Sequence, residues 1–355
     1  MVDLVRSRSL APNAALLLIS FACLAPVQLA AQTPAKAPAS KQATYKPARL
    51  ADGKPDFSGF WSYNTATPFV RPDRFQGREF LRPDEVQAVE TGRHRVDEDR
   101  VKGAPCVVFI TNSNCAASVG GPRGGPGGVG DYNAVFLEMD KSKVVATMRT
   151  SILVDPKDGK MPPMKPEATA SAAAARAYRL EHPFDGPENL TTFDRCMTGG
   201  GAPYGAGPYN NTLHVVQSPT HVAITQEMMH DVRVIPLDGR PHGEVRQWQG
   251  DSVGHYEGDT LVVETTNFNG KRGRADQRTK VTERFTRTAA DILLYQFTVD
   301  APDLYTAPYS GELPMTLSKD PVYEYACHEG NYSMPLILSG ARADERAAAA
   351  KSGTK

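Results

Sequence analysis

Two short segments of the sequence hold side chains that can transfer protons near neutral pH. The first contains Glu227 and His230, and the second contains His328 and Glu329. Histidine titrates near neutrality, and burial can raise the pKa of a carboxyl group into the same range, so these residue types suit general acid–base catalysis. These four residues form the candidate catalytic set.

Residues that can hold a small ligand surround both segments. Guanidinium groups bind carboxylates or a developing oxyanion, and aromatic rings stack on planar or sugar-like ligands while their polar edges form hydrogen bonds. The candidate substrate-binding residues are Arg233, Arg246, Trp248, His255, Tyr256, Tyr323 and Tyr325. Ordinary surface ion pairs and strand packing remain the alternative explanation for these residues.

Motifs for other kinds of chemistry are missing from the sequence. It has no His-Glu-x-x-His or Cys-x-x-Cys spacing for zinc and no dinucleotide fingerprint. The Gly-rich residues 118–130 lack the Lys-Ser/Thr of a phosphate cradle, and Ser252 lies in a loop-like context without a nucleophile elbow. We therefore expect no metal and no cofactor.

The N-terminus has the features of an export signal. Arg6 and Arg8 precede the apolar stretch AALLLISFACLAPVQLAA, whose last residues, Leu29-Ala30-Ala31, suit signal cleavage. A retained membrane anchor is the alternative. We expect residues 1–31 to be a signal peptide and the mature protein to be periplasmic or secreted, with no membrane contact after cleavage.

Export favours disulfides among the remaining cysteines. Cys23 leaves with the signal, and the chain keeps Cys106, Cys115, Cys196 and Cys327. Four cysteines allow three pairings. The short spacing in CVVFITNSNC favours Cys106–Cys115, and Cys196–Cys327 is then the second bridge.

The composition favours a fold rich in β-strands and turns. The 355 residues include 30 Gly and 28 Pro, and 40 basic residues balance 40 acidic ones, which gives no field that would attract nucleic acid. Residues 32–52, rich in Pro, Ala and Lys, predict a disordered linker. Residues 83–100, residues 166–181 and the C-terminal tail predict helices.

Strand patterns dominate the rest of the chain. In DILLYQFTV, Leu293, Tyr295, Phe297 and Val299 share one face. Similar patterns include NAVFLEM, KVVATMRTSILV and PVYEYAC, which gives about eleven strands at hairpin spacing, typical of a barrel or a sandwich. Gly59-x-Trp61 resembles the opening of lipocalin-like barrels. We therefore expect a single domain over residues 53–350, a mainly β, lipocalin-like antiparallel β-barrel with helical insertions and a C-terminal helix.

Alternation also predicts where the histidines lie. In HDVRVIPL, His230 shares a face with Val232 and Val234, which we expect to line the barrel interior unless a bulge intervenes. Cys327 should fix the end of the strand PVYEYAC, so that His328 stands at the barrel rim. The two histidines would then line one cavity.

Four blocks resemble a large family of exported bacterial hypothetical proteins: DGKPDFSGFW, LDGRPH, GDTLVVETTNF and YEYACHEGNY. The resemblance covers nearly the whole mature chain. It implies export and a common fold, and it transfers no active site.

These observations lead to two functional hypotheses, both with a small-molecule partner and neither with nucleic acid. The first is an exported, cofactor-independent enzyme that uses acid–base chemistry, a lyase, isomerase or hydrolase, on a small aromatic or sugar-like ligand in a barrel pocket. The alternative is a non-catalytic periplasmic ligand-binding barrel protein.

Overall fold

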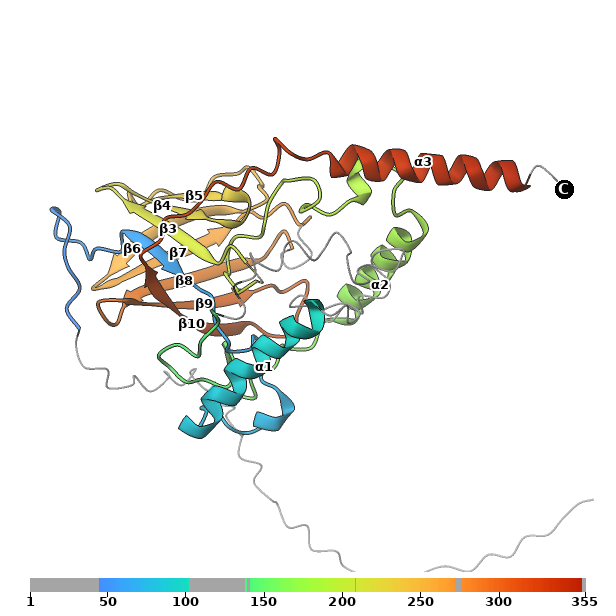
Figure 1. The fold of residues 1–355 in the computed structure, drawn as a ribbon. Coiled ribbons are helices and arrows are strands. Elements are labelled where there is room, and N and C mark those ends of the chain that lie inside the picture. Colours follow the sequence, from blue (N-terminus) through green and yellow to red (C-terminus); the bar gives the residue numbers. More distant parts are fainter. Residues whose placement is uncertain (1–44, 102–137, 139–140, 208, 272–275, 353–355) are drawn as a thin grey trace, which may run out of the picture. The chain divides into compact units, whose positions relative to one another are not determined.

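The structure, a computed structural model, describes residues 45–101, 138, 141–207, 209–271 and 276–352. One compact unit contains all of them. Its centre is an antiparallel sheet (Figure 1). The strands are β1 (Gly59–Ser62), β2 (Leu153–Asp155), β3 (Thr212–Gln217), β4 (His221–Gln226), β5 (Val232–Pro236), β6 (Asp251–Glu257), β7 (Thr260–Thr266), β8 (Lys280–Arg287), β9 (Ile292–Asp300) and β10 (Tyr309–Ser318).

The strand order describes an up-and-down barrel. The hydrogen-bonded order is β5-β4-β3-β1-β10-β9-β8-β7-β6, with β2 added beside β10. Sequence neighbours are therefore spatial neighbours, as in lipocalins. The two edge strands, β5 and β6, approach each other without a ladder. Gly254 of β6 permits this approach, because a Cβ there would lie 2.8 Å from Ile235 of β5.

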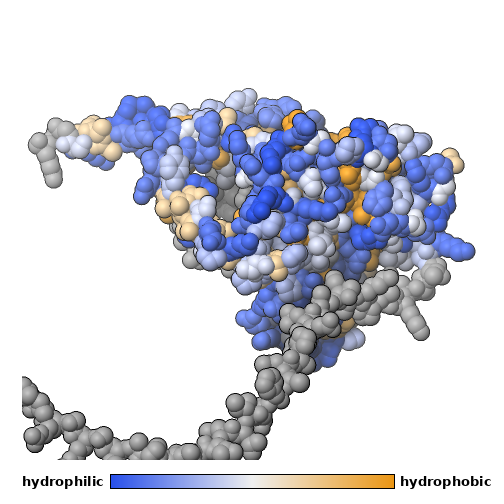
Figure 2. Space-filling model, turned by 180° about the vertical axis from the view of Figure 1, so that it is seen from behind, coloured by the Kyte–Doolittle hydropathy of each residue, from blue (hydrophilic) through white to orange (hydrophobic). Residues whose placement is uncertain are grey.

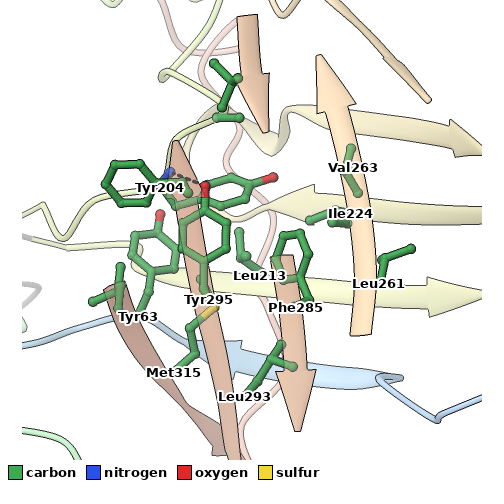
Figure 3. Close-up of a cluster of buried hydrophobic side chains, with 14 of the residues drawn as sticks. Tyr63, Tyr204, Leu213, Ile224, Leu261, Val263, Phe285, Leu293, Tyr295 and Met315 are labelled. Carbon is green, nitrogen blue, oxygen red and sulfur yellow. Dashed lines mark hydrogen bonds between the residues drawn. The ribbon is translucent and has the colours of Figure 1, made fainter. Parts of the chain in front are cut away.

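The barrel interior is filled by side chains that alternate along each strand. Leu293, Tyr295, Phe297 and Val299 of β9 are all buried, as the sequence pattern predicts. Figure 3 shows Leu293 and Tyr295 of β9 together with interior side chains from other strands, among them Leu213, Val263 and Phe285. Trp61 is fully buried toward one end of the barrel, which we call the Phe57 end. Its Nε1 donates to the Phe57 carbonyl oxygen (2.8 Å), and the Arg287 guanidinium lies 5.3 Å from its ring centroid.

Helices lie outside the barrel wall. They are α1 (Pro83–Val101), α2 (Pro166–Glu181) and α3 (Ser333–Ser352), with short 3-10 turns at Asp73–Phe75, Pro187–Asn189 and Met228–His230. In the part of the chain that the structure describes, no helix is both long and apolar enough to span a membrane. Hydrophilic residues predominate on the face drawn in Figure 2, as expected when the apolar residues fill the barrel.

The predicted fold class is confirmed: a mainly β, lipocalin-like antiparallel barrel with helical insertions and a C-terminal helix. The helices predicted over residues 83–100 and 166–181 are also present, at Pro83–Val101 and Pro166–Glu181. The ordered chain begins before residue 53, because Arg49 pairs with Pro55 in a β-bridge and with Asp259 in an ion pair.

Two strand predictions and one loop prediction are wrong. The described part of KVVATMRTSILV is a strand only at Leu153–Asp155, and PVYEYAC (residues 321–327) is irregular, so His328 does not follow a strand. Conversely, Ser252, placed in a loop-like context from sequence, lies in β6. Most of NAVFLEM lies outside the described residues.

Close packing inside the barrel gives a test of the fold. Gly311 of β10 lies opposite Phe297 of β9, and an added Cβ would lie 2.2 Å from the Phe297 ring. We expect Gly311→Ala to lower the free energy of unfolding by about 1–3 kcal/mol, because it overpacks the core. Gly340 of α3 has open space around it, so Gly340→Ala should cause no loss. Urea unfolding of both variants measures this, and equal midpoints would contradict the packing.

Candidate functional site

A charged pair lies inside the barrel. Arg233 of β5 and Glu283 of β8 have side chains that are 4% and 0% exposed, and both guanidinium ends contact the carboxylate, Nη1 to Oε1 at 3.1 Å and Nη2 to Oε2 at 2.5 Å. Removing two charges from water is costly unless geometry and hydrogen bonds compensate. The pair therefore marks the interior position where polar chemistry is concentrated.

Two phenols complete a closed ring of hydrogen bonds around this pair. Arg233 Nη1 donates to the Tyr204 hydroxyl oxygen (3.1 Å), and the Tyr295 hydroxyl donates to Glu283 Oε1 (3.0 Å). The Tyr204 backbone N–H in turn donates to the Tyr295 hydroxyl oxygen (3.2 Å), the bond drawn in Figure 3. The hydroxyl of Tyr204 is thus held by Arg233, and its backbone N–H is held by Tyr295, which itself donates to Glu283.

Hydroxyl groups from β6 and β7 extend the polar set. Arg233 Nη2 donates to Thr265 Oγ1 at 3.4 Å, and Thr265 Oγ1 lies 2.8 Å from Ser252 Oγ. Arg233 Nε has no hydrogen-bond partner. We call Arg233, Glu283, Tyr204, Tyr295 and Thr265 the interior cluster.

Tyr204 reaches this cluster from outside the barrel strands. It belongs to residues 198–207, the plug segment, which precedes β3 and lies at the end of the barrel near Tyr63. Asp231 Oδ2 accepts hydrogen bonds from Thr198 Oγ1 and from the Gly199 N–H, both 2.8 Å, and Gln226 Oε1 accepts from the Gly201 N–H. Gly201 adopts φ +75°, which favours glycine at this turn.

Burial controls the ionisation of the interior cluster. It raises the pKa of Tyr204 to about 12 and that of Tyr295 well above its usual value. Burial also acts to lower the pKa of Arg233, but the Glu283 carboxylate outweighs it, so this pKa is raised. The interior therefore contains one compensated ion pair and two neutral phenols at neutral pH.

His230 is not inside the barrel, which corrects the face assigned to β5. Arg233 and Ile235 are buried, whereas Val232 and Val234 are 54% and 59% exposed. A 3-10 turn precedes the strand, with φ +61° at Met229 and +41° at His230, so the alternation does not continue back to His230. His230 is exposed and its Nδ1 lies 2.9 Å from the Tyr325 carbonyl oxygen.

The two polar segments meet, but at the surface. His230 contacts the backbone of the segment that carries His328, yet His328 and Glu329 are both exposed. The two histidines therefore do not line the barrel interior, contrary to the expectation of a shared cavity there. Within the described residues, no hydrogen bond or ion pair joins the side chains of Glu227, His230, His328 and Glu329.

The other candidate binding residues are spread over the molecule. Arg246 is exposed and donates to the Phe268 and Gln277 carbonyl oxygens, and His255 is exposed beside Glu257. Tyr256 lies at the Phe57 end, where its hydroxyl accepts from Gln217 (2.8 Å). Trp248 and Tyr325 are half-buried, and Tyr323 is exposed. Of the predicted binding residues, Arg233 alone belongs to the interior cluster.

Glu227 is buried near the plug segment. Its Oε2 has no hydrogen-bond partner, and its backbone N–H donates to the Thr212 carbonyl oxygen (2.9 Å). Burial, and then the charge of Glu138, raise the pKa of this carboxyl group. Glu227 is therefore a proton-binding group at the Tyr63 end of the barrel.

The Cys196–Cys327 disulfide is present, as predicted, with 5.7 Å between the Cα atoms. The bridge joins Cys196, which lies two residues before the plug segment, to the segment that carries His328. Asn331 Nδ2 also donates to the Asp194 carbonyl oxygen (3.0 Å). Cys106 and Cys115 lie outside the described residues. Among the described residues, no group of three or more His, Cys, Asp or Glu side chains is arranged to hold a metal ion.

Sequence reasoning missed Tyr204 and Glu283. The pattern for Glu283 was available, because Val281 and Phe285, two residues away on either side, share its inward face. For Tyr204 no periodic pattern exists, since it lies in the Gly-rich stretch TGGGAPYGAG.

Comparisons with known proteins add little to this geometry. No protein-family model and no curated protein matches the chain. Among solved structures, a crystal structure of a mutant of the fluorescent protein UnaG is similar at 13% sequence identity, over 36% of this chain and 86% of that chain, with a TM-score of 0.22. At this score the likeness carries no argument, and the barrel rests on its strand pairing.

The buried ion pair gives a stability prediction. Glu283→Leu leaves the Arg233 charge buried without its partner, so we expect a loss of about 3–5 kcal/mol in the free energy of unfolding. The double variant Arg233→Met/Glu283→Leu should recover most of this loss, because it removes both charges. Chemical denaturation of the wild type and the two variants measures the loss and its recovery. A Glu283→Leu variant as stable as the wild type would refute the prediction.

The raised pKa of Glu227 gives a pH prediction. A carboxyl group whose pKa is raised on folding favours the folded state while it stays protonated, and this contribution is lost as the pH rises through the raised pKa. Glu227→Gln removes that loss. We expect the stability of the variant relative to the wild type to increase between about pH 4 and pH 8. Unfolding curves across this range measure it.

Adding Glu138→Gln provides the control. It removes the neighbouring charge that helps to raise the Glu227 pKa. When both proteins carry Glu138→Gln, the gain in stability from Glu227→Gln with rising pH should therefore be smaller. A relative stability that stays flat across the pH range would contradict the assignment.

Proposed function

We propose that this chain is an exported barrel protein that binds a small molecule in its interior, at the end closed by the plug segment. The observation that carries the proposal is the position of Tyr204. A side chain from outside the strands fills the interior and satisfies a buried ion pair, so this space accepts an aromatic group that enters from the end of the barrel.

Binding sites usually combine apolar walls with a few fixed polar groups. The interior has this composition. Leu213, Ile224 and Val263 belong to its apolar core (Figure 3), and Arg233 is a charged group there. Replacing a buried ion pair with apolar residues is often neutral or stabilising, so stability alone does not account for the pair. Its presence in the interior supports a role in recognition.

The geometry favours binding over the acid–base enzyme. His230 and His328 are exposed, and water competes with hydrogen bonds and screens charges at such positions. Glu227 is buried, but no described hydrogen bond links its carboxyl group to either imidazole ring. The signal-like N-terminus and the Cys196–Cys327 bridge both support an oxidising compartment outside the cytoplasm.

A metabolite extract tests the proposal. The purified full chain is incubated with the extract, repurified and unfolded, and the released compounds are identified by mass spectrometry. We expect stoichiometric release of an unchanged compound from the wild type and from the surface control His230→Ala/His328→Ala. The folded variant Arg233→Met/Glu283→Leu should release much less, because it lacks the polar contacts.

Two outcomes would overturn the proposal. Release of a chemically converted compound that depends on His230 and His328 would favour the enzyme. Equal binding by the wild type and Arg233→Met/Glu283→Leu would place the ligand outside the barrel interior.

A further inference from the structure

The contacts of Tyr204 describe the ligand that this site accepts, provided that the proposed ligand-binding function holds. Tyr204 is only 2% exposed, although it is supplied by a Gly-rich segment and not by a strand. Its hydroxyl accepts from Arg233, and its ring is enclosed by other aromatic rings. Tyr204 is thus a resident aromatic group in a place that an external one could occupy.

The walls around the Tyr204 ring are aromatic. Its centroid lies 5.5 Å from the Tyr295 ring and 6.0 Å from the Tyr63 ring, both tilted, which are favourable aromatic geometries. The Arg233 guanidinium lies 5.7 Å from the Tyr204 ring centroid. Figure 3 shows Tyr63, Tyr204 and Tyr295 gathered at one end of the core. These walls suit a planar ring with one polar atom.

The polar end of the site suits a neutral hydroxyl. Glu283 engages both Nη atoms of Arg233, so the positive charge is already compensated. A carboxylate or phenolate at the Tyr204 position would bring a second negative charge close to Glu283, in a buried site that strengthens repulsion. A neutral hydroxyl that accepts one hydrogen bond from Nη1 avoids this cost.

We propose that the barrel binds neutral hydroxylated aromatic rings, phenols, in the place that Tyr204 occupies, with Arg233 donating to the hydroxyl of the ligand. The plug segment then withdraws Tyr204 as the ligand enters. Its own anchors, Asp231 and Gln226, lie at the barrel end and do not belong to the ring-binding site.

Ionisation within the site agrees with this choice of ligand. The titratable groups facing the Tyr204 hydroxyl are Arg233, Glu283, Tyr295 and Tyr63, with Asp231 also exerting a charge effect. Burial raises the pKa of Tyr204 to about 12, so the site disfavours a phenolate. A phenol should therefore bind in its protonated form, and its affinity should fall as the pH rises through the pKa of the free phenol.

Tyr204 competes with any external ligand. A tethered side chain acts at an effective concentration on the order of mM, so its removal should raise the affinity for an external phenol by about tenfold or more. An apolar ring of the same size leaves the Arg233 donor unpaired, so toluene should bind about tenfold more weakly than phenol.

The test uses para-nitrophenol, whose phenolate is yellow and whose neutral form is not. Titrating wild-type protein into the dye should abolish the yellow absorbance in a saturable way, and Tyr204→Ala should do so at about tenfold lower concentration. Thermal unfolding of Tyr204→Ala with phenol or toluene then measures the preference for the hydroxyl. If Tyr204→Ala does not fold, Tyr204→Phe keeps the ring but not the hydroxyl, and should also bind the dye more tightly than wild type.

Phe57→Ala is the matched control. It opens a ring-sized space at the opposite end, far from Arg233, and should show no preference for phenol over toluene. Equal binding of phenol and toluene by Tyr204→Ala, or tighter binding of benzoate than of phenol, would overturn the phenol assignment while leaving a ligand-binding barrel in place. Binding of phenol by the variants but not by the wild type would show that Tyr204 stays in the core, and would overturn the proposed exchange with a ligand. Failure of the metabolite experiment would reject the proposed function itself.

Discussion

The ion pair between Arg233 and Glu283 is the constraint on which the rest of the interior depends. Two buried charges are tolerable only if they pair closely and if neighbouring groups satisfy their remaining hydrogen bonds. Strands β5 and β8 supply the charges, β9 supplies Tyr295, β7 supplies Thr265, and the plug segment supplies Tyr204. The pair therefore ties together parts of the barrel wall and the segment that closes its end.

The two ends of the barrel are held by different sets of contacts. At the Phe57 end, the Trp61 indole donates to the Phe57 carbonyl oxygen and lies under the Arg287 guanidinium, and Gln217 hydrogen-bonds to the Phe57 N–H and the Tyr256 hydroxyl. At the Tyr63 end, closure depends on a segment without regular structure, so its backbone groups need side-chain partners. Asp231 and Gln226 provide them, and Cys196–Cys327 fixes the chain just before the segment begins.

Much of the fold was predictable because burial on one face leaves a period of two in the sequence. Leu293, Tyr295, Phe297 and Val299 follow that period and are buried as expected. The pattern failed at β5, because Val232 and Val234 favour strands whichever face they occupy, and here they are exposed while Arg233 faces the interior. Of the site, Arg233 was predicted, whereas the position of Tyr204 depends on contacts between residues far apart in the chain.

The location of polar groups decides between the two functional hypotheses more clearly than their identity does. Histidines and carboxylates are the residue types of acid–base catalysis, but catalysis also needs a site that excludes water and fixes geometry. His230, His328 and Glu329 are exposed, whereas Arg233, Glu283 and Tyr295 are buried, where each electrostatic interaction is stronger. The polar groups whose geometry is fixed by burial and hydrogen bonds therefore lie in the barrel interior, and this supports the proposed binding function over the acid–base enzyme.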